Sequence, residues 1–583
     1  MQLLSRDERG FTMVTVISAL LVVTLLSVAA LSYAQTDLPA GAKDRDRKMA
    51  YAAAEAGVQN YAFYLAQDPA YWTKCTSNTP PQINQRWNGI GPEVRRFVPV
   101  PDSTTSEYAI ELLPANGESI CDVSRPESTM LDTPTRTFRI RVTGRVGGLN
   151  GVKRSIVVNF KRKSLLDYVY FTDKETLSPI LAPVQVGSRP TRRPSSCVGT
   201  ACRDLKTWAV AECDRYYGND ADGLRQSQKF DGQYKTTNTT STWSTLDVPC
   251  FPIVFIGADV IAGPFHTNDE FDCNGSPTFG LNAQDPIETS SKGQTADPAS
   301  GYRSCTPHFV GTHDQNAAPI DIPPTNEALY RDTAASYRFV GHTQITLTGT
   351  TMTVTGTREN GTSVSGVSMP IPPNGVVYVS NRTAGKPPGS PGYPCPGYNV
   401  LNPYELVAND ACGNLEVKGN YDVNVTLTAE NDIIVMDNIT RPVGSPTPDP
   451  DVLLGLISNN FIRVYHPVTG CEKDSDENYG CNWIDGCANA SGQINSTTID
   501  AAILSLNHSF ILDNFHCGTN LGTLTVRGAI VQKFRGAVGR GSSGYTKAYS
   551  YDTRLRFRAP PKFLDPVQAG WRVQTYNEQV PAR

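Results

Sequence analysis

The sequence of 583 residues lacks the short motifs that mark several common enzyme and ligand-binding classes. It contains no Gly-x-Ser-x-Gly, no His-Glu-x-x-His and no Walker phosphate-binding loop. No two cysteines are spaced Cys-x-x-Cys, and no Cys/His spacing resembles a zinc finger, which argues against a structural zinc site. We therefore expect no enzymatic activity and no cofactor, apart from the calcium ion considered below.

A strong excess of charge is also missing. The formal net charge is −4 and the isoelectric point is about 6.0, so nothing draws the whole chain towards nucleic acid. One C-terminal stretch is locally basic, with tyrosines between the charges, a pattern that can bind nucleic acid strands. Because Asp552 and Asp565 lie close by, we interpret it as a solvated strand face and do not expect nucleic acid as a partner. Its basic residues are Lys533, Arg535, Arg540, Lys547, Arg554, Arg556, Arg558 and Lys562.

Charged side chains are absent from Phe11 to Thr36, a run of 26 residues. As a helix, this run would be ~39 Å long at ~1.5 Å per residue, which exceeds the ~30 Å hydrocarbon core of a bilayer. A secretory signal has an apolar core of only ~7–15 residues before an Ala-x-Ala type site, which Ser32-Tyr33-Ala34 matches poorly. The run therefore predicts a transmembrane or assembly helix over residues 11–36. A cleaved signal and a plain anchor are the alternatives.

Cysteine is absent before this run, and all 14 cysteines follow it. Disulfides in an oxidising compartment are the natural interpretation, so we expect a single-pass membrane protein with an extracytoplasmic body. The lysines and arginines that flank the run favour the opposite orientation in the membrane, because more of them follow the run than precede it. Sequence does not fix the disulfide pairing. Local loops between Cys197 and Cys202 and between Cys481 and Cys487 are two options.

After the apolar run, Pro39 and Gly41 predict a kink or break. Helical periodicity resumes at Asp44 and predicts an extracytoplasmic helix over residues 37–66. Its apolar face is rich in small residues, which suits close packing against another helix or a sheet. The face comprises Ala50, Ala53, Ala54, Gly57, Val58, Tyr61, Ala62 and Leu65. Alternating strand patterns then predict an antiparallel sheet over residues 67–166.

The junction Gly10-Phe11-Thr12-Met13 and the stretch from Asp46 to Gly57 resemble the PilX-type minor pilins. The resemblance covers roughly the first 65 residues. It implies that residues 1–10 are a leader, that prepilin peptidase cuts after Gly10, and that Phe11 is then methylated. It also implies incorporation into a type IV pilus or pseudopilus beside other pilin subunits, after residence in the cytoplasmic membrane.

The chain departs from this family at Thr15, the fifth residue of the expected mature chain. Most pilins have Glu there, and in the family that Glu is held to meet the N-terminal amine of a neighbouring subunit. Subunits without it are associated with filament tips. Thr15 is therefore the expected assembly position, and it leaves open that the protein does not polymerise.

The remaining body is much larger than a pilin head. Short strands separated by Gly, Asn and Asp, with no helix signals between them, favour a β-solenoid or a stacked β-sandwich. We found no strict repeat period. We therefore expect a mainly β protein with a long N-terminal helix, a pilin-like helix and sheet, a solenoid-like domain over residues 167–450 and a C-terminal β-rich domain over residues 451–583.

One acidic loop has the spacing of a calcium site. Oxygen ligands fall at positions 1, 3, 5, 9 and 12 of the loop, namely Asp474, Asp476, Asn478, Asn482 and Asp485. Two features argue against a calcium site. Position 6 is Tyr479, although the sharp turn there requires Gly, and the last ligand is Asp instead of the longer Glu. A disulfide-tied acidic surface loop is the alternative.

A second polar cluster runs from His266 to Asp272, and we interpret it as a solvated corner with side-chain-to-backbone hydrogen bonds.

The leading hypothesis for the whole chain is a minor, tip-located pilin-like subunit that displays a large exterior domain for assembly or adhesion to an unknown surface ligand. The first alternative is a membrane-anchored cell-surface adhesion protein that does not polymerise. The second is a β-solenoid enzyme acting on polysaccharide.

Overall fold

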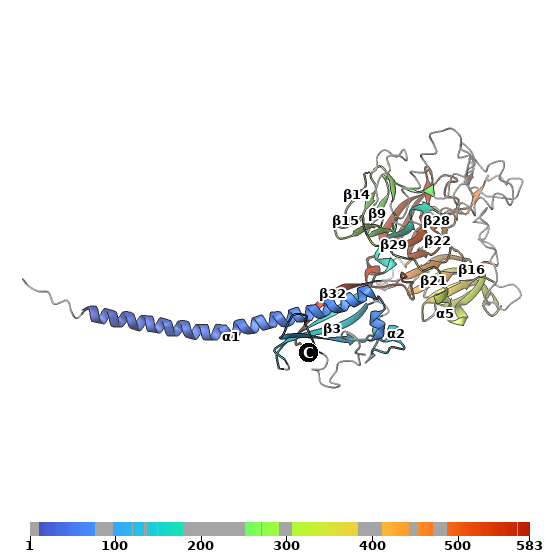
Figure 1. Ribbon diagram of the computed structural model, residues 1–583. Helices are drawn as coiled ribbons and strands as arrows, with labels where there is room; N and C mark the ends of the chain where they lie inside the picture. The colour runs from blue at the N-terminus through green and yellow to red at the C-terminus, as the bar shows by residue number, and fades with distance from the viewer. Residues whose placement is uncertain are drawn as a thin grey trace, which may run out of the picture. The chain divides into compact units, whose positions relative to one another are not determined.

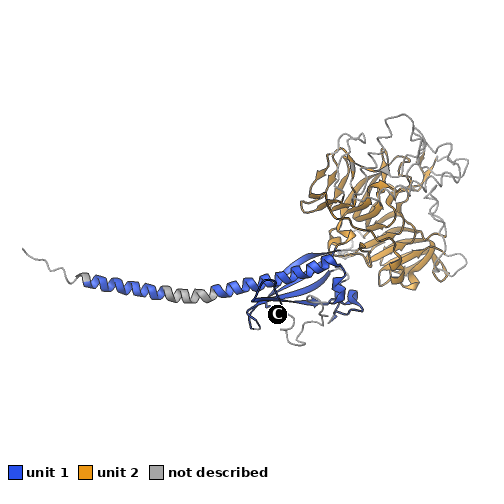
Figure 2. Ribbon diagram, viewed as in Figure 1, with its two compact units in different colours: residues 1–162, 570–583 blue, residues 163–569 orange. Residues whose placement is uncertain are grey.

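The computed structural model describes residues 11–75, 97–118, 121–132, 135, 137–148, 150–178, 181, 251–269, 271–290, 306–382, 411–441, 452–469, 487–567 and 570–582. The chain divides into two compact units (Figure 2). Unit 1 is Met1–Arg162 with Gly570–Arg583, and unit 2 is Lys163–Ala569. The chain is mostly β with a long N-terminal helix (Figure 1), which confirms that part of the predicted fold class.

Helix α1 of unit 1 runs from Phe11 to Gln67 without interruption. The helical assignment spans Pro39 and Gly41, so the expected break is absent, whereas a kink there stays a prediction. A proline inside a helix removes one hydrogen bond and costs about 3 kcal/mol or more. Long helical stretches on both sides, one apolar and one rich in alanine, outweigh that local cost. The two helices expected over residues 11–36 and 37–66 are thus one element.

A five-stranded antiparallel sheet completes unit 1, in the order β1-β2-β3-β4-β32. A turn joins β3 (Thr137–Val146) to β4 (Val152–Arg162), with Gly147 and Gly148 at φ of 86° and 75°. The further elements of the unit are η1 (Tyr71–Lys74), β1 (Val98–Pro99), β2 (Ser106–Leu113), α2 (Pro126–Met130), β3 (Thr137–Val146), β4 (Val152–Arg162) and β32 (Trp571–Gln579).

The C-terminal half of α1 packs against this sheet. Its buried residues follow the predicted apolar face and include Ala50, Ala54, Val58, Tyr61 and Leu65. They meet a core formed by the inward side chains of the strands, among them Ile110, Phe138, Ile140, Val142, Ile156 and Phe160. The small-residue face therefore contacts the sheet of its own unit.

Strand β32 shows that unit 2 is an insertion between two neighbouring strands of unit 1. The chain leaves β4 at Arg162 and returns at Trp571, and these two residues are paired in the sheet. The indole of Trp571 lies against Phe138, with ring centroids 4.7 Å apart, and donates a hydrogen bond to the Pro69 carbonyl at 2.7 Å. The domain boundaries expected from sequence differ from this arrangement, since they assign residues 571–579 to the C-terminal β-rich domain.

Unit 2 contains short strands with a few helical turns between them. They are η3 (Leu165–Asp167), β5 (Tyr170–Lys174), β6 (Thr176–Leu177), β7 (Phe251–Pro252), β8 (Val254–Ile256), β9 (Val260–Ala262), β10 (Phe265–Thr267), β11 (Asp272–Asn274), β12 (Thr278–Phe279), β13 (Pro286–Thr289), β14 (His308–Phe309), β15 (Thr312–Asp314), α5 (Glu327–Asp332), η5 (Ala335–Tyr337), β16 (Arg338–Gly349), β17 (Thr351–Arg358), β18 (Ser363–Pro370), β19 (Val376–Ser380), β20 (Leu415–Tyr421), β21 (Val425–Ala429), β22 (Ile433–Thr440), β23 (Leu454–Ser458), β24 (Ile462–Val464), β25 (Val468–Thr469), β26 (Ala488–Asn489), β27 (Thr498–Ser505), β28 (Phe510–Leu512), β29 (Asn520–Phe534), β30 (Gly539–Arg540), β31 (Ser543–Tyr551) and η7 (Thr553–Arg556).

Most of these strands stack in parallel, one turn of the chain on the next. One ladder runs β19-β21-β23-β27-β29-β5-β10-β13-β15. A second runs β16-β20-β22-β24-β28, and a third runs β27-β29-β31-β9-β12-β14. Strands β16, β17 and β18 pair antiparallel. We call this stack of parallel strands the coil. It confirms a mainly β body, and the solenoid stays a prediction.

The order of strands in the coil differs from their order in the chain. Strand β5, the first long strand of unit 2, lies between β29 and β10. From β5 the ladder follows the chain to β15, and β16 then begins a second series that returns to β29 and β31. Two segments of the chain, residues 163–314 and 338–551, therefore meet where β5 stacks on β29. We call this contact the joint.

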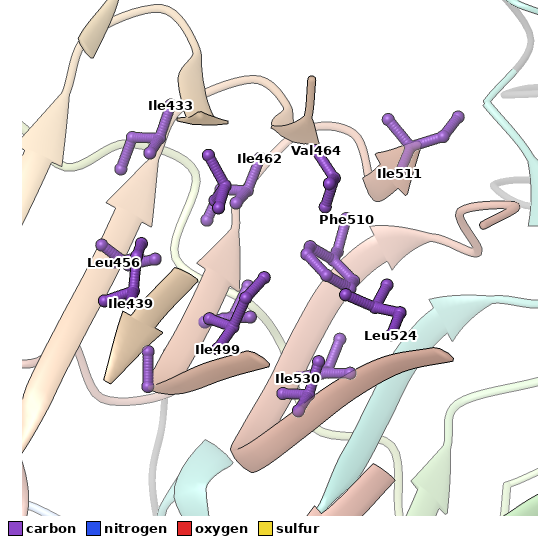
Figure 3. Close-up of a cluster of buried hydrophobic side chains, with 14 of the residues drawn as sticks. Ile433, Ile439, Leu456, Ile462, Val464, Ile499, Phe510, Ile511, Leu524 and Ile530 are labelled. Atoms are coloured by element: carbon purple, nitrogen blue, oxygen red, sulfur yellow. The ribbon is translucent and has the colours of Figure 1, made fainter. Parts of the chain in front are cut away.

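The interior of the coil is filled by rows of aliphatic and aromatic side chains. Figure 3 shows Ile433, Ile462 and Phe510, which are neighbours on successive turns, in one such row. A second apolar layer covers the outer side of the first ladder and includes Phe171, Tyr378, Ile457 and Leu504 with Leu329 of α5. Because these strands are buried on both faces, their sequences are continuous apolar runs more often than alternating ones.

Disulfides are confirmed in both units. Cys75 is bonded to Cys121 in unit 1, and Cys487 to Cys517 in unit 2. Cys273 and Cys412 are also disulfide-bonded. The local Cys481–Cys487 loop considered from sequence is wrong, because chain folding brings Cys517 beside Cys487 instead. The Cys197–Cys202 option lies outside the described residues.

Candidate functional site

The N-terminal half of α1 is apolar on all sides. From Met13 to Val28 its large hydrophobic side chains are 53% to 68% exposed. The hydroxyl groups of Thr24 and Ser27 donate to the carbonyls of Leu20 and Val23 in the same helix, at 2.8 and 2.7 Å. A helix that is hydrophobic all round belongs in an apolar environment. This surface is the candidate functional site of unit 1.

The predicted processing and assembly residues lie at or before the start of this helix. Gly10 lies outside the described residues, and α1 begins at Phe11. Thr15 lies in the exposed apolar stretch of α1. Cleavage after Gly10, methylation of Phe11 and an assembly role for Thr15 stay predictions. Among the residues that the structure describes, no helix combines the length and the apolar character needed to cross a membrane.

The C-terminal half of α1 is held to its sheet by an unusually close contact at Gly144 of β3. A Cβ added there would lie 2.0 Å from the carbonyl oxygen of Ala50 and 2.5 Å from the backbone nitrogen of Ala54. Gly57 makes the converse contact from the helix, where an added Cβ would meet Tyr108 and Val142, each at 2.6 Å. The small residues therefore let the backbone of the C-terminal half of α1 approach the sheet closely.

The polar cluster that begins at His266 is buried, so the prediction of a solvated corner is wrong. His266, Thr267, Asn268 and Asp269 are all 0% exposed, because this segment includes β10, in the first ladder of the coil. The hydrogen bonds from side chain to backbone are present as expected. The Asp269 carboxylate, for example, accepts from the backbone N–H of Glu175 at 3.0 Å.

His266 is the centre of a hydrogen-bond network on the outer side of the coil. Its Nδ1 lies 2.8 Å from the Glu288 carboxylate and its Nε2 lies 2.9 Å from the Asn268 side-chain oxygen. Its ring stacks on Phe171 with centroids 5.1 Å apart. Burial raises the pKa of Glu288, but hydrogen bonds from His266 and Tyr168 outweigh it, and the net pKa shift is downward. Because both ring nitrogens of His266 form hydrogen bonds and the side chain is fully buried, this histidine stabilises the contacts between neighbouring strands.

The proposed calcium ligands Asp474, Asp476, Asn478, Asn482 and Asp485 lie outside the described residues. Within the described part of the chain, no group of three or more His, Cys, Asp or Glu side chains is placed to hold a metal ion. Calcium binding by the acidic loop stays a prediction.

The basic C-terminal stretch does not form one continuous basic surface in the described structure. Arg535 pairs with Glu175 at 3.2 Å, Lys547 with Asp259 at 3.0 Å, and Arg556 with Asp285 at 2.8 Å. Arg554 pairs with Asp552, and Lys562 with Asp332. Several of these partners come from segments more than 200 residues away in the chain, so sequence proximity could not reveal them.

The pair Arg535–Glu175 is the feature that sequence reasoning missed. Both side chains are buried in the joint, at 2% and 4% exposure, and the guanidinium lies 3.4 Å from the centre of the Phe255 ring. Burial raises the pKa of Glu175, and the charge of Arg535 opposes that shift. A buried charge is costly unless it is paired, so each of these two side chains depends on the other where β5 stacks on β29.

Comparison with known proteins gives little further information. No protein-family model and no curated protein matches the chain. Among solved structures, the chain is similar to the competence-associated pilin ComZ from Thermus thermophilus, at 13% sequence identity and a TM-score of 0.31. The match covers 92% of this chain and 97% of that one. A TM-score this low does not establish a shared fold.

Proposed function

We propose that the protein is a pilin-like subunit of a type IV pilus or pseudopilus, and that unit 2 is its exterior domain for assembly or adhesion. The observation that carries the proposal is the division of α1. One half is bound to an antiparallel sheet through small residues, and the other half is a bare apolar rod. A helix surface that is apolar all round can be buried in a bundle of like helices.

In this proposal, unit 1 is the mounting part and unit 2 is the displayed part. The insertion of unit 2 between β4 and β32 supports that division of roles, because a large body added there leaves α1 and the order β1-β2-β3-β4 unchanged. The body would lie outside the cytoplasmic membrane, where the disulfides of both units can persist. Other pilin subunits and the prepilin peptidase are its proposed partners.

The mature N-terminus tests the proposal directly. We expect Edman or mass-spectrometric sequencing of the protein from its native cells to give a chain that starts at methylated Phe11. The variant Gly10→Val should retain the leader and disappear from sheared filaments, whereas Gly41→Ala, in an exposed part of α1, should behave as the parent. A mature chain that starts at Met1 or after Ala34 would refute the pilin-like assignment.

Thr15 favours a second candidate function, a membrane-anchored adhesion protein that does not polymerise. Without the family's Glu, the N-terminal amine of a neighbour lacks its usual acidic partner. Purified filaments separate the two proposals, because an end subunit should co-purify with them at low copy number and a non-polymerising anchor should not. The variant Thr15→Glu should raise the copy number if the chain is an end subunit.

A further inference from the structure

A lysine and an aspartate face each other from two neighbouring parallel strands of the coil. Tyr549 of β31 is paired with Ile261 of β9, so Lys547 and Asp259 stand at matching positions, two residues earlier on each side. The Lys547 Nζ lies 3.0 Å from an oxygen of the Asp259 carboxylate. The two residues are 288 positions apart in the sequence. Their contact therefore joins the first segment of the coil to the second.

Aromatic side chains shield this pair from most of the solvent. The side chains of Asp259 and Lys547 are 7% and 18% exposed, and the Lys547 Nζ lies 5.9 Å from the centre of the Phe255 ring. Burial lowers the pKa of Lys547, the charge of Asp259 opposes that shift, and the charge of Arg535 adds to it. Because the net shift of the pKa is downward, Lys547 reaches the neutral, nucleophilic form of the amine more readily than an exposed lysine does.

A local turn fixes the carboxylate in front of this amine. The Asp259 Oδ2, the oxygen that contacts Lys547, also accepts from the backbone N–H of Ile256 at 3.0 Å. The backbone N–H of Asp259 donates in return to the Ile256 carbonyl at 2.8 Å. A donor on this oxygen stabilises the negative charge that develops there when an amine adds to the carboxyl carbon. Groups held in contact in this way react as if at concentrations of about 10⁵–10⁸ M.

We propose that Lys547 and Asp259 condense to an isopeptide bond, an amide between their two side chains. The Lys547 Nζ attacks Cγ of Asp259, an N–C bond forms, a C–O bond of the carboxyl group breaks, and that oxygen leaves as one water molecule. Both hydrogens of the water come from the Lys547 ammonium group, which begins with three hydrogens and ends with one. The step therefore consumes no oxidant, reductant or other reagent.

Burial favours the amide over the ion pair from which it forms. In water, solvation stabilises the separate charges of an ammonium and a carboxylate, whereas a buried site withdraws much of that solvation and leaves the neutral amide less affected. A space beside Lys547 offers about 10 Å³ to the centre of a water-sized sphere, which is room for the water molecule that the reaction releases.

The bond would act on the stability of unit 2 as a disulfide does, because a cross-link between residues 288 positions apart restricts the unfolded chain. In contrast to a disulfide, it would persist under reducing conditions.

Peptide mass spectrometry of the full chain tests the proposal. The folded protein is denatured, its disulfides are reduced and alkylated, and it is then digested with trypsin, which cuts after Lys547 only where the amine is free. We expect the peptide Gly541–Arg554, uncut at Lys547, to be joined to the peptide that contains Asp259. The joined product should be lighter by one water molecule than the sum of the two peptides. Separate peptides, with Lys547 cut, would overturn the proposal and leave an ion pair.

A pair of matched variants assigns the bond to its residues. Lys547→Arg keeps a positive charge beside Asp259, but the guanidinium stays protonated and does not attack a carboxyl group, so the joined peptide should be lost completely. Lys562→Arg makes the same substitution in the exposed pair with Asp332 and should keep the joined peptide in full. A joined peptide that survives Lys547→Arg would contradict the assignment. The digest of the parent chain decides whether the bond exists even if Lys547→Arg does not fold. This inference does not depend on the pilin-like function.

Discussion

The two units bury their side chains in different ways. In unit 1, one helix lies against one face of an antiparallel sheet, and the contact depends on small residues such as Gly144 and Ala50. In unit 2, parallel strands enclose their own core, and charged side chains such as Arg535 and Glu175 are buried where two chain segments meet.

This difference indicates what limits each unit. Unit 1 is limited by space, because any atom added between α1 and β3 meets backbone. Unit 2 is limited by charge balance at the joint, because each buried ion there depends on a partner from the other segment. If the units are independent, a change in one should leave the stability of the other unaltered. The following predictions test that comparison, from the largest effect to the smallest.

Loss of the buried arginine should have the largest effect. Arg535→Met leaves the Glu175 carboxylate buried without its partner and should destabilise unit 2 by about 3–5 kcal/mol. Lys562→Met is the control, because Lys562 and Asp332 are 48% and 42% exposed and such pairs contribute about 1 kcal/mol or less. Denaturant unfolding followed by hydrogen exchange would assign each loss to a unit. Similar losses of unfolding free energy in the two variants would contradict a larger contribution of the buried pair than of the exposed pair.

A single methyl group at the helix–sheet contact should act on unit 1 alone. Gly144→Ala places Cβ 2.0 Å from the Ala50 carbonyl oxygen, and the backbone shift should cost about 1–3 kcal/mol. Gly41→Ala should have the opposite sign, a gain of up to about 1 kcal/mol in helix stability, because nothing lies within 4 Å of its added Cβ. Thermal unfolding of both variants measures these changes in stability. A loss of protection from hydrogen exchange in unit 2 on Gly144→Ala would show that the two units are not independent.

The stability of unit 2 should depend on pH through Asp513. Burial raises the pKa of Asp513 to about 6, with Arg463 opposing the shift and Asp432 adding to it. The ordinary pKa is about 3.9, so the folded state binds this proton more tightly than the unfolded state does. This contribution to stability is therefore lost as pH rises through the folded pKa, and recovered as pH falls.

Between pH 7 and pH 5, this group should add about 1 kcal/mol to the stability of unit 2. Asp513→Asn should remove that gain, and the difference between variant and parent cancels the other carboxylates of the unit. Unfolding curves at the two pH values provide the measurement. An unchanged pH dependence in the variant would show that Asp513 does not titrate in this range.

Removal of the whole body should have the smallest effect on unit 1. Arg162 and Trp571 are paired neighbours, so an Asn-Gly turn can join them in place of residues 163–570. We expect the shortened chain to form the Cys75–Cys121 disulfide. Its free energy of unfolding should differ by about 1 kcal/mol or less from that of unit 1 in the parent. Calorimetry of the two proteins measures this. A shortened chain that does not fold would show that unit 1 needs the body.

Local patterns predicted much of unit 1. The small-residue helix face and the antiparallel sheet after it could be predicted, because helices and strands have sequence periods of 3.6 and 2 residues. The apolar run could be predicted from the absence of charge. The return of β32 could not be predicted, since a short strand of mixed polar residues carries no sign of a partner more than 400 residues away. In the same way, His266 and its neighbours look solvated by composition, and only the neighbouring turns of the coil bury them.

The sequence by itself determined the elements with a strong local signal, namely the long apolar and alanine-rich helix, the antiparallel sheet after it and a mainly β body. Periodicity and composition carry that information because they depend on neighbours within a few residues. Only the tertiary structure decided the insertion of unit 2 between β4 and β32, the stacking of β5 on β29 and the pairing of Arg535 with Glu175. These contacts join residues hundreds of positions apart, where burial and charge balance, not local propensity, choose the partner.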